Sequence, residues 1–574
     1  MKRIILTIGA VLAMTGAATA QTNRDTGGLL TDRDIMTPSE LFALSQTQFN
    51  FGTARAMAMA GAFTSLGADA SSLAINPAGL GMYRKNELTF TPMMTFGRST
   101  TPGTMTYGKN SNSRFAVSNF SVAVNLVNRT KGLVSLTMGI GYNRIADFNY
   151  NYAYQRTGQA ASVADVFARQ LTWSGLTRDS FYDNGGNGDW NWNRIDPEYW
   201  NAALAYRAYM VDDPAHTGAW SPTWIGNNAD IGHYTEVKSR GAAGEYTIAF
   251  GANIENKFYF GLSLGIQDIR QKLYIDYAED YFYADAADSP HGYGTDPSLD
   301  YQLLYAKLNQ AVVTNGVGVN LKIGFVWRPT AGLRIGAAFH TPTAYTVDRK
   351  FQSSAASMAF ANRNTDPAVH PDAAGYISSG TEGMTSPLLV DENPDSWNFS
   401  TPSRLLLGAS YTFGSRAIVA VDYERDWYNG LRMKSNPLGS GYSESCKSTF
   451  TDRFKGSNTL RIGAEFKVSP AVALRAGYGY SGSMLRDEHT VLAQPAVKKT
   501  VYVGAGVGFV LSRVCSLDLA YQYMRRTTTD YYLFYASETV AQPDGNFEEM
   551  FAESSLYRTR FARHNVALTL GFRF

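Results

Sequence analysis

The chain has 574 residues, with 51 basic and 49 acidic side chains and a formal net charge of +2 at pH 7. This balance gives no electrostatic reason to expect nucleic acid as a partner. Aromatic residues make up 13% of the chain, glycine occurs 53 times and only 17% of residues are charged, a composition that favours β-structure. After the N-terminal segment, no stretch approaches the roughly 20 consecutive apolar residues of a membrane helix. A membrane-spanning form of this chain must therefore be a closed β-barrel.

Residues 1–20 form the first predicted element. They read MKRIILTIGAVLAMTGAATA, in which Lys2 and Arg3 precede an apolar stretch that ends in small residues. This pattern predicts a secretory signal peptide cleaved before Gln21. An uncleaved membrane anchor is the alternative, and it is disfavoured because the apolar stretch is short. Without Lys2 and Arg3 the chain has equal numbers of basic and acidic residues.

Residues 21–85 lie between the signal peptide and the first predicted strand. Much of this segment reads FGTARAMAMAGAFTSLGADASSLAINPAGLGMYR, which is rich in small residues and suits a chain that threads a confined space. Asp69 is placed to cap one short helix. Asn76 caps a second turn, because Pro77 follows it at the position that proline favours. We therefore expect a compact structure here, with two short helical turns.

From residue 86 onward, segments of alternating hydrophobicity are separated by turns. In LRIGAEFKV, Leu460 and Ile462 lie on one face and Arg461 and Gly463 on the other. The predicted strands are 86–98, 115–127, 133–149, 244–254, 258–277, 316–328, 332–345, 402–413, 416–431, 458–468, 472–482, 499–511, 516–532 and 559–574. Short turns alternate with long loops, as in bacterial outer-membrane barrels. The sequence therefore predicts an all-β fold, a transmembrane antiparallel β-barrel of fourteen strands over residues 86–574.

The last strand, HNVALTLGFRF, ends the sequence on Phe574. A terminal strand ending in Phe resembles the signal that the barrel-assembly machinery of Gram-negative bacteria reads, so we expect that machinery as a partner and the outer membrane as the location. With this end in the periplasm, the turn that holds Cys515 is also periplasmic. Cys446 then lies in the external loop 432–457, a membrane away, and the two cysteines do not pair.

Three long external loops are expected at about 150–243, 278–315 and 346–401. The stretch DPEYWNAALAYRAYMV predicts a helix, with Asp196 as its cap and Pro197 at its first position. Apolar stripes in these loops have two interpretations: they pack the loops onto one another, or they form an external patch where an apolar ligand lands. The candidate patch residues are Phe167, Leu171, Trp200, Leu204, Tyr301, Leu304, Tyr305 and Leu308.

The alternation of VDYERDW points three acids into the barrel, and later strands place bases on the same side. These residues are Asp422, Glu424, Asp426, Arg461, Lys467 and Arg475. Ion pairs that hold the lumen together are one interpretation, and a path for charged solutes is the other. None of the seven His residues joins an HExxH or GxSxG motif, and no cysteine cluster or phosphate-binding glycine loop is present. We therefore predict no catalytic residue, no metal site and no cofactor.

The stretch ARAMAMAGAFTSLGADASSLAINPAGL, from Ala54 to Leu80, resembles the N-terminal hatch of the FadL/TodX family, with its Asn-Pro-Ala motif. This family comprises outer-membrane transporters for long-chain fatty acids and other hydrophobic compounds. The resemblance implies that residues 21–85 form a hatch that plugs the barrel from the periplasmic side. The hatch residues that it singles out are Arg55, Asp69, Asn76, Pro77, Ala78 and Gly79. Asn76 and Pro77 are expected to pin the hatch in its closed state.

The resemblance also implies a function. A hydrophobic, fatty-acid-like small molecule is captured at the external loops, enters the lumen, triggers a hatch rearrangement and leaves sideways into outer-membrane lipid, with no direct energy coupling. We expect a monomer. No head-group residues are carried over from the family, because the loops of this chain are its own.

Two alternatives stay open at this stage. A surface-exposed binding or adhesion protein would use the long loops and keep the hatch as a stopper. A haem-binding receptor would need histidines in those loops, and no His-rich loop is present. Deleting Ala54–Leu80 alters ligand passage if the protein is a transporter, whereas an adhesion protein has no passage to lose.

Overall fold

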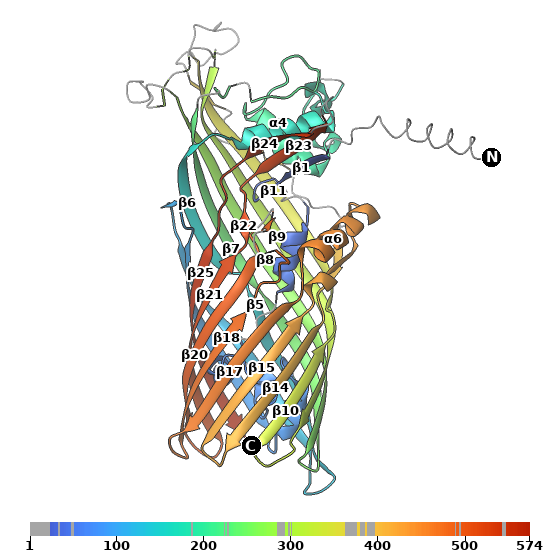
Figure 1. Ribbon diagram of the computed structural model, residues 1–574, viewed down its shortest axis with the longest axis vertical. Helices are drawn as coiled ribbons and strands as arrows, with labels where there is room; N and C mark the ends of the chain where they lie inside the picture. The colour runs from blue at the N-terminus through green and yellow to red at the C-terminus, as the bar shows by residue number, and fades with distance from the viewer. Residues whose placement is uncertain are drawn as a thin grey trace, which may run out of the picture.

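The structure, a computed structural model, describes residues 23–31, 35–46, 51–184, 188–222, 224–226, 229–283, 293–294, 296, 299, 301–361, 376–378, 385–386, 396–487, 490–492, 495–541 and 547–574. The predicted signal peptide lies outside the described residues. Most of the described chain forms one tall barrel, shown in Figure 1. Among the described residues, no helix is long and apolar enough to cross a membrane.

Fourteen antiparallel strands close the barrel, as the alternation predicts, and the last strand pairs with the first. In chain order they are β2 (Glu87–Thr100), β4 (Ser111–Asn128), β5 (Leu133–Asp147), β7 (Asp230–Ile254), β8 (Phe258–Phe282), β9 (Tyr301–Trp327), β10 (Leu333–His340), β14 (Arg404–Phe413), β15 (Ala417–Asp426), β17 (Ser457–Lys467), β18 (Val472–Ser481), β20 (Val497–Val510), β21 (Cys515–Thr528) and β25 (Arg560–Arg573). The fold-class prediction is confirmed.

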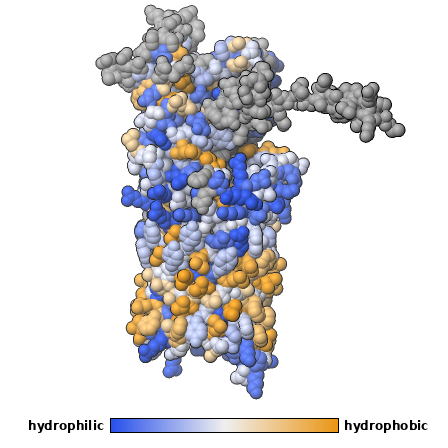
Figure 2. Space-filling view, in the orientation of Figure 1, coloured by the Kyte–Doolittle hydropathy of each residue, from blue (hydrophilic) through white to orange (hydrophobic). Residues whose placement is uncertain are grey.

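One end of the barrel carries only short turns and the other carries the long insertions. We call them the turn end and the loop end. Next to the turn end, large apolar side chains point outward, for example Leu262, Ile323 and Phe466, which are 53%, 57% and 50% exposed. Figure 2 shows hydrophobic residues gathered across the visible face of the lower barrel, with a hydrophilic region above them. A band of outward apolar residues is what lipid requires of a barrel wall.

Several strands run far beyond this band toward the loop end, which corrects the predicted loops. The loop predicted over 150–243 contains β6 (Tyr150–Gln159) and the first half of β7, and β8 and β9 extend into the loop predicted over 278–315. The third predicted loop contains β11 (Ala344–Ala361), β12 (Tyr376–Ser378) and β13 (Ser396–Ser400). Above the membrane the outward face meets water, so the apolar alternation that reveals a strand is lost.

The insertions form a helical layer over the loop end. It contains α4 (Val163–Ser174), η3 (Arg178–Phe181), η4 (Trp192–Arg194), η5 (Pro197–Tyr199) and α5 (Trp200–Arg207). The predicted helix is therefore split into η5 and α5, and Asp196 makes no side-chain capping bond. A further helix, α6 (Ser440–Arg453), lies beside η7 (Tyr428–Gly430) and β16 (Arg432–Ser435).

A small separate sheet lies among these helices. Strand β1 (Asn23–Gly27) pairs with β23 (Tyr535–Ala541), which pairs with β24 (Phe547–Glu553). Figure 1 places this sheet next to α4 at the loop end. The remaining short strands are β3 (Met105–Thr106), β19 (Val491–Leu492) and β22 (Asp530–Tyr531).

Candidate functional site

A compact segment, residues 51–83, fills the lumen near the turn end; we call it the plug. It contains α3 (Ala54–Ala58), η1 (Ala70–Leu73) and η2 (Pro77–Met82). The Asp69 side chain caps η1 by accepting from the Ser71 N–H, and the Asn76 side chain caps η2 by accepting from the Ala78 N–H. These are the two capped turns that the sequence predicts.

The plug rests on a ring of inward-facing glycines that sequence reasoning did not identify. Nine strands each contribute a glycine at which a Cβ atom would come within 3.0 Å of a plug atom. They are Gly139, Gly251, Gly261, Gly324, Gly336, Gly408, Gly463, Gly477 and Gly504. Only a residue without a side chain allows the wall to approach the plug this closely. The signal was present in the sequence, because inward positions of successive strands are repeatedly glycine.

Polar side chains then fix the plug to the wall. The Asp422 carboxylate accepts from the Thr64 N–H at 2.7 Å. The Arg55 guanidinium donates to the Glu465 carboxylate at 2.9 Å. The Asn76 amide donates to the Thr64 carbonyl at 2.6 Å and also reaches the carbonyls of Phe325 and Ala337 on the wall. Arg55 and Asn76 therefore both join plug to barrel.

The other predicted hatch residues lie in or next to the same turn. Pro77, Ala78 and Gly79 belong to η2, and Pro77 and Ala78 contact the glycines of β8 and β9. A Cβ at Gly79 would meet the Ser72 side chain at 2.5 Å. All three are buried, so this turn is packed between the barrel wall and the rest of the plug.

Of the predicted lumen charges, Asp422, Glu424, Asp426 and Arg461 are buried and Arg475 is partly buried, and each of these five has a specific partner, whereas Lys467 is exposed at the turn end. Glu424 pairs with Arg461, and the Arg404 guanidinium lies 3.4 Å from the Asp426 carboxylate. Arg475 bonds to Glu465 at 2.7 Å and to Asp518 at 2.5 Å. Asp422, described above, bonds to the plug. These contacts cross-link neighbouring strands and the plug, which leaves the lower lumen closed.

A second helix, α2 (Pro38–Ser45), fills the lumen above the plug. Its Leu41, Phe42 and Leu44 pack in an apolar cluster with residues of the wall and of α6. Its Glu40 carboxylate accepts two hydrogen bonds from the Arg349 guanidinium, at 3.2 and 3.4 Å, and both side chains are buried. The helix is therefore held by its apolar face, by this ion pair and by a hydrogen bond that Arg404 of the wall donates to the Ser45 carbonyl at 3.2 Å.

The external apolar patch predicted from the loop stripes is not present as an exposed surface. Phe167, Leu171, Leu204, Leu304 and Leu308 are buried, Trp200 is 6% exposed, and Tyr301 and Tyr305 are partly buried. The stripes pack the loops onto one another, which was the other interpretation. Residues 301–308, predicted to lie in an external loop, belong to strand β9, because β8 and β11 pair with it on both sides.

Helix α4 is anchored to the barrel by a buried carboxylate. Glu279 of β8 accepts from the Val163 N–H at 2.8 Å and from the Ser162 hydroxyl at 2.5 Å, at the first turn of α4. It also accepts from the hydroxyls of Tyr277 and Tyr281. Burial, together with this carboxylate, raises the pKa of both tyrosines well above the usual value. The anchored loops form a fixed rim around the loop end.

A groove of about 580 Å³ opens at this rim. Its described lining includes Trp173, Tyr199, Tyr442, Tyr532 and Tyr535 from the loop layer and the N-terminal turn of α2. Sequence reasoning missed the groove, because its walls come from five segments far apart in the chain. Aromatic side chains beside polar ones are typical of small-molecule sites.

The opposite end of α2 faces smaller cavities inside the barrel. Ala43, Leu44 and Gln46 line one of about 60 Å³, together with Phe148, Tyr150, Tyr152 and Phe561. Helix α2 thus separates the outer groove from the inner cavity. A volume near 60 Å³ holds only a few water molecules, so a larger ligand needs α2 to move.

The barrel wall is interrupted next to the inner cavity. The ladder between β4 and β5 ends at Asn119 and Asn143, and the last five residues of β5 are all buried, so the strand turns into the lumen. Beyond that point β4 pairs only with β2. Successive residues of β4 point to opposite faces of the strand, yet Ser113, Arg114 and Phe115 are all exposed. A small cavity at this break shares Tyr150, Phe561 and Arg563 with the inner cavity.

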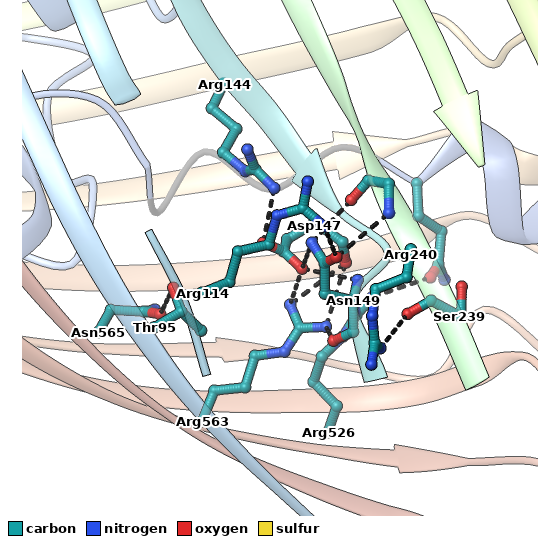
Figure 3. Close-up of polar contacts among 12 residues, drawn as sticks. Thr95, Arg114, Arg144, Asp147, Asn149, Ser239, Arg240, Arg526, Arg563 and Asn565 are labelled. Atoms are coloured by element: carbon teal, nitrogen blue, oxygen red, sulfur yellow. Dashed lines mark hydrogen bonds and ion pairs between the residues drawn. The ribbon is translucent and has the colours of Figure 1, made fainter. Parts of the chain in front are cut away.

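Polar side chains, rather than a strand ladder, bridge the break (Figure 3). The Arg114 guanidinium donates to the Asn149 side chain at 2.6 Å. Arg144 and Arg563 both pair with Asp147, at 2.8 and 3.4 Å, and Arg563 also donates to the Asn149 carbonyl. These bonds hold the inward-turned end of β5 against β4 and β25. Each of these side-chain bonds can break and re-form separately, whereas the backbone hydrogen bonds of a continuous strand ladder depend on one another.

A family model described as outer membrane protein transport protein (OMPP1/FadL/TodX) matches residues 202–538, more than half of the chain. The chain belongs to the FadL/TodX family. This confirms the resemblance, and it does so through residues outside Ala54–Leu80. The FadL/TodX protein described here is therefore an outer membrane transport protein with a β-barrel fold.

Three solved structures are similar to this FadL/TodX protein. A Pseudomonas aeruginosa FadL homologue is 14% identical, with a TM-score of 0.48 and coverage of 91% of this chain and 98% of that one. The P. putida toluene transporter TodX is 14% identical, with a TM-score of 0.46 and coverage of 92% and 99%. The Ralstonia pickettii toluene transporter TbuX is 12% identical, with a TM-score of 0.46 and the same coverage. No curated protein sequence matches this chain.

Replacing Glu40 by glutamine is expected to loosen α2. Removing one partner of a buried ion pair costs about 3 kcal/mol, so hydrogen exchange of the α2 amides is expected to accelerate on the order of a hundredfold. Mass-spectrometric hydrogen exchange over residues 38–45 measures this. Lys447→Gln is the control, because it breaks an exposed pair with Glu444 on α6 and leaves α2 unchanged. Equal exchange in both variants would contradict the role of Arg349 in holding α2.

Proposed function

We propose that this outer membrane transport protein takes up hydrophobic, fatty-acid-like compounds from outside the cell. The loop end faces the exterior, and the ligand lands in the aromatic groove of the rim. Helix α2 then moves, and the ligand enters the inner cavity beside Tyr150 and Phe561. It leaves sideways through the break between β4 and β5 into the outer membrane.

One observation carries this proposal. The inner cavity and the cavity at the wall break share three lining residues, whereas the lumen toward the turn end is filled by the plug. A path that ends at lipid suits an apolar solute, because that solute gains free energy by leaving water. The same path offers little to a hydrophilic solute, which needs an aqueous exit.

The plug takes part as the hatch. Its Gly52 N–H donates to the Ser118 hydroxyl at 2.9 Å, and Ser118 lies on β4 next to the last residue that pairs with β5. A shift of the plug therefore acts directly on the strand that borders the exit. No energy source is needed, since the apolar ligand moves down its own free-energy gradient into lipid.

Mass spectrometry of small molecules that co-purify with the folded protein in mild detergent tests the proposal. We expect a reproducible lipid or hydrocarbon, and we expect a strain that lacks the protein to take up labelled hydrophobic compounds more slowly. Finding only detergent, together with unchanged uptake of labelled fatty acids, would overturn the fatty-acid version. Surface binding without any passage would instead favour an adhesion protein.

A further inference from the structure

Four basic side chains form a row on the outer surface of the barrel, on neighbouring strands. Lys499 lies on β20, Arg525 on β21, Arg560 on β25 and Arg98 on β2. All four are exposed and point outward, because they alternate with buried inward residues along their strands. We call this set the basic row.

The strand register brings the four side chains to nearly the same height. Arg525 and Arg98 each pair with Ala562, on opposite sides of β25, and Arg560 lies two residues further along β25. Lys499 and Arg560 each pair with Thr527. Since adjacent strands lie about 4.8 Å apart, the basic row spans roughly 15 Å.

The basic row stands at the upper border of the lipid-facing band. Between the basic row and the turn end, the outward face of the same strands carries Phe96, Tyr521, Val503 and Val566. All four side chains are large, apolar or aromatic, and exposed. Aromatic side chains mark the interface between hydrocarbon and head groups in outer-membrane barrels. The basic row therefore lies at head-group height on the side of the loop end.

None of the four side chains makes a hydrogen bond or an ion pair with another residue in the described part of the chain. Two outward bases on the other wall do have acidic partners. On β7, Lys238 lies 3.0 Å from Glu236 and 3.6 Å from Asp276, and on β8, Arg270 lies 3.6 Å from Asp268. Acids therefore partner Lys238 and Arg270, whereas no acid in the described chain partners a member of the basic row.

We propose that the basic row binds the phosphate groups of a phosphorylated glycolipid, lipid A, in the outer leaflet of the outer membrane. Guanidinium groups match phosphate oxygens in geometry as well as in charge. The acyl chains of the same lipid would lie along the apolar side chains below the row. The hydroxyls of Thr100 and Thr527, which border the row, add hydrogen-bonding groups. This proposal does not depend on the transported ligand.

Lipid binding by three purified proteins tests the proposal. They are the natural protein, an outer variant with Lys499→Gln, Arg525→Gln, Arg560→Gln and Arg98→Gln, and a control variant with the same number of charges removed from the turn end. The control changes are Lys131→Gln, Lys257→Gln, Arg416→Gln and Arg513→Gln, all at exposed turn residues. Native mass spectrometry and titration in mixed micelles measure the affinity for lipid A and for its dephosphorylated form. Heat-modifiable migration on gels verifies that each variant is folded.

We expect the natural protein and the control to prefer phosphorylated lipid A, and the outer variant to bind it at least about tenfold more weakly, since one basic residue near an anionic surface is worth roughly fivefold. Replacing the three arginines by lysine is expected to keep most of the affinity. Equal binding of the dephosphorylated lipid by the natural protein would overturn the proposal. So would an equal loss of affinity in the control variant.

Discussion

Replacing Gly261 by valine is expected to turn the closed barrel into a water-filled pore. A Cβ at this position would lie 2.2 Å from the Ala78 nitrogen and 2.2 Å from the Pro77 carbonyl carbon. Both are backbone atoms, so no side chain can rotate away, and the first turn of η2 must leave its seat on the wall. Because this turn joins the plug to β8 and β9, its displacement opens the lumen at the turn end.

Single-channel conductance in planar bilayers measures the effect, supported by the entry of a large hydrophilic antibiotic into cells. Leu262→Val is the matched control, because residue 262 lies next along β8 and points to lipid. We expect a conductance near zero for the control and for the natural protein. A Gly261→Val barrel that is folded and equally non-conducting would show that the plug is not the seal.

A bulky group at residue 114 is expected to stop uptake of hydrophobic compounds. Arg114 pairs with Thr95, whose side chain is buried in the lumen, so the Arg114 side chain points inward at the wall break. A cysteine there, reacted with a large maleimide, would fill the exit between β4 and β5. If the ligand leaves through this exit, uptake falls to the level of a strain without the protein.

The test needs a background in which Cys446 and Cys515 are replaced by alanine, since both are free thiols. Ser113→Cys is the control, because Ser113 pairs with Phe96 and shares its outward orientation. The label at residue 113 is expected to leave uptake unchanged, and a small maleimide at residue 114 to inhibit less than a large one. Full uptake with the large label at residue 114 would place the exit elsewhere.

Inside the membrane the sequence predicts the fold well, because lipid imposes a strict period of two on each strand. All fourteen strands are found, and the caps of Asp69 and Asn76 are correct since a cap depends only on neighbouring residues. Above the membrane this constraint disappears, so the extensions of β7, β8 and β9 looked like loops. Helix α6 was missed for a related reason: it buries only Cys446 and Phe450 and shows no apolar stripe.

The candidate site depends on contacts between distant segments, which single-sequence patterns do not reveal. The alternation of the strands shows that many inward positions are glycine, but the plug that these glycines contact is indicated only by the family resemblance. The stripes of Phe167 and Leu204 were recognised, yet their periodicity does not tell packing against a neighbour from exposure to a ligand. The groove and the wall break arise where several such segments meet, as does the ion pair of Glu40 with Arg349.

The small sheet at the loop end has a consequence for how the protein is assembled. Asn23 pairs with Thr539 at the loop end, whereas residue 87 starts the first barrel strand at the turn end, and the described parts between them include α2 and the plug, which lie one above the other in the lumen. The ladder between β2 and β25 therefore closes around α2 and the plug, which precede the first strand in the sequence. Such long-range contacts slow folding, and here they also impose an order. The plug, residues 51–83, must be inside before the first and last strands meet, because the glycine ring fits closely around it and leaves no room to thread it into a finished barrel.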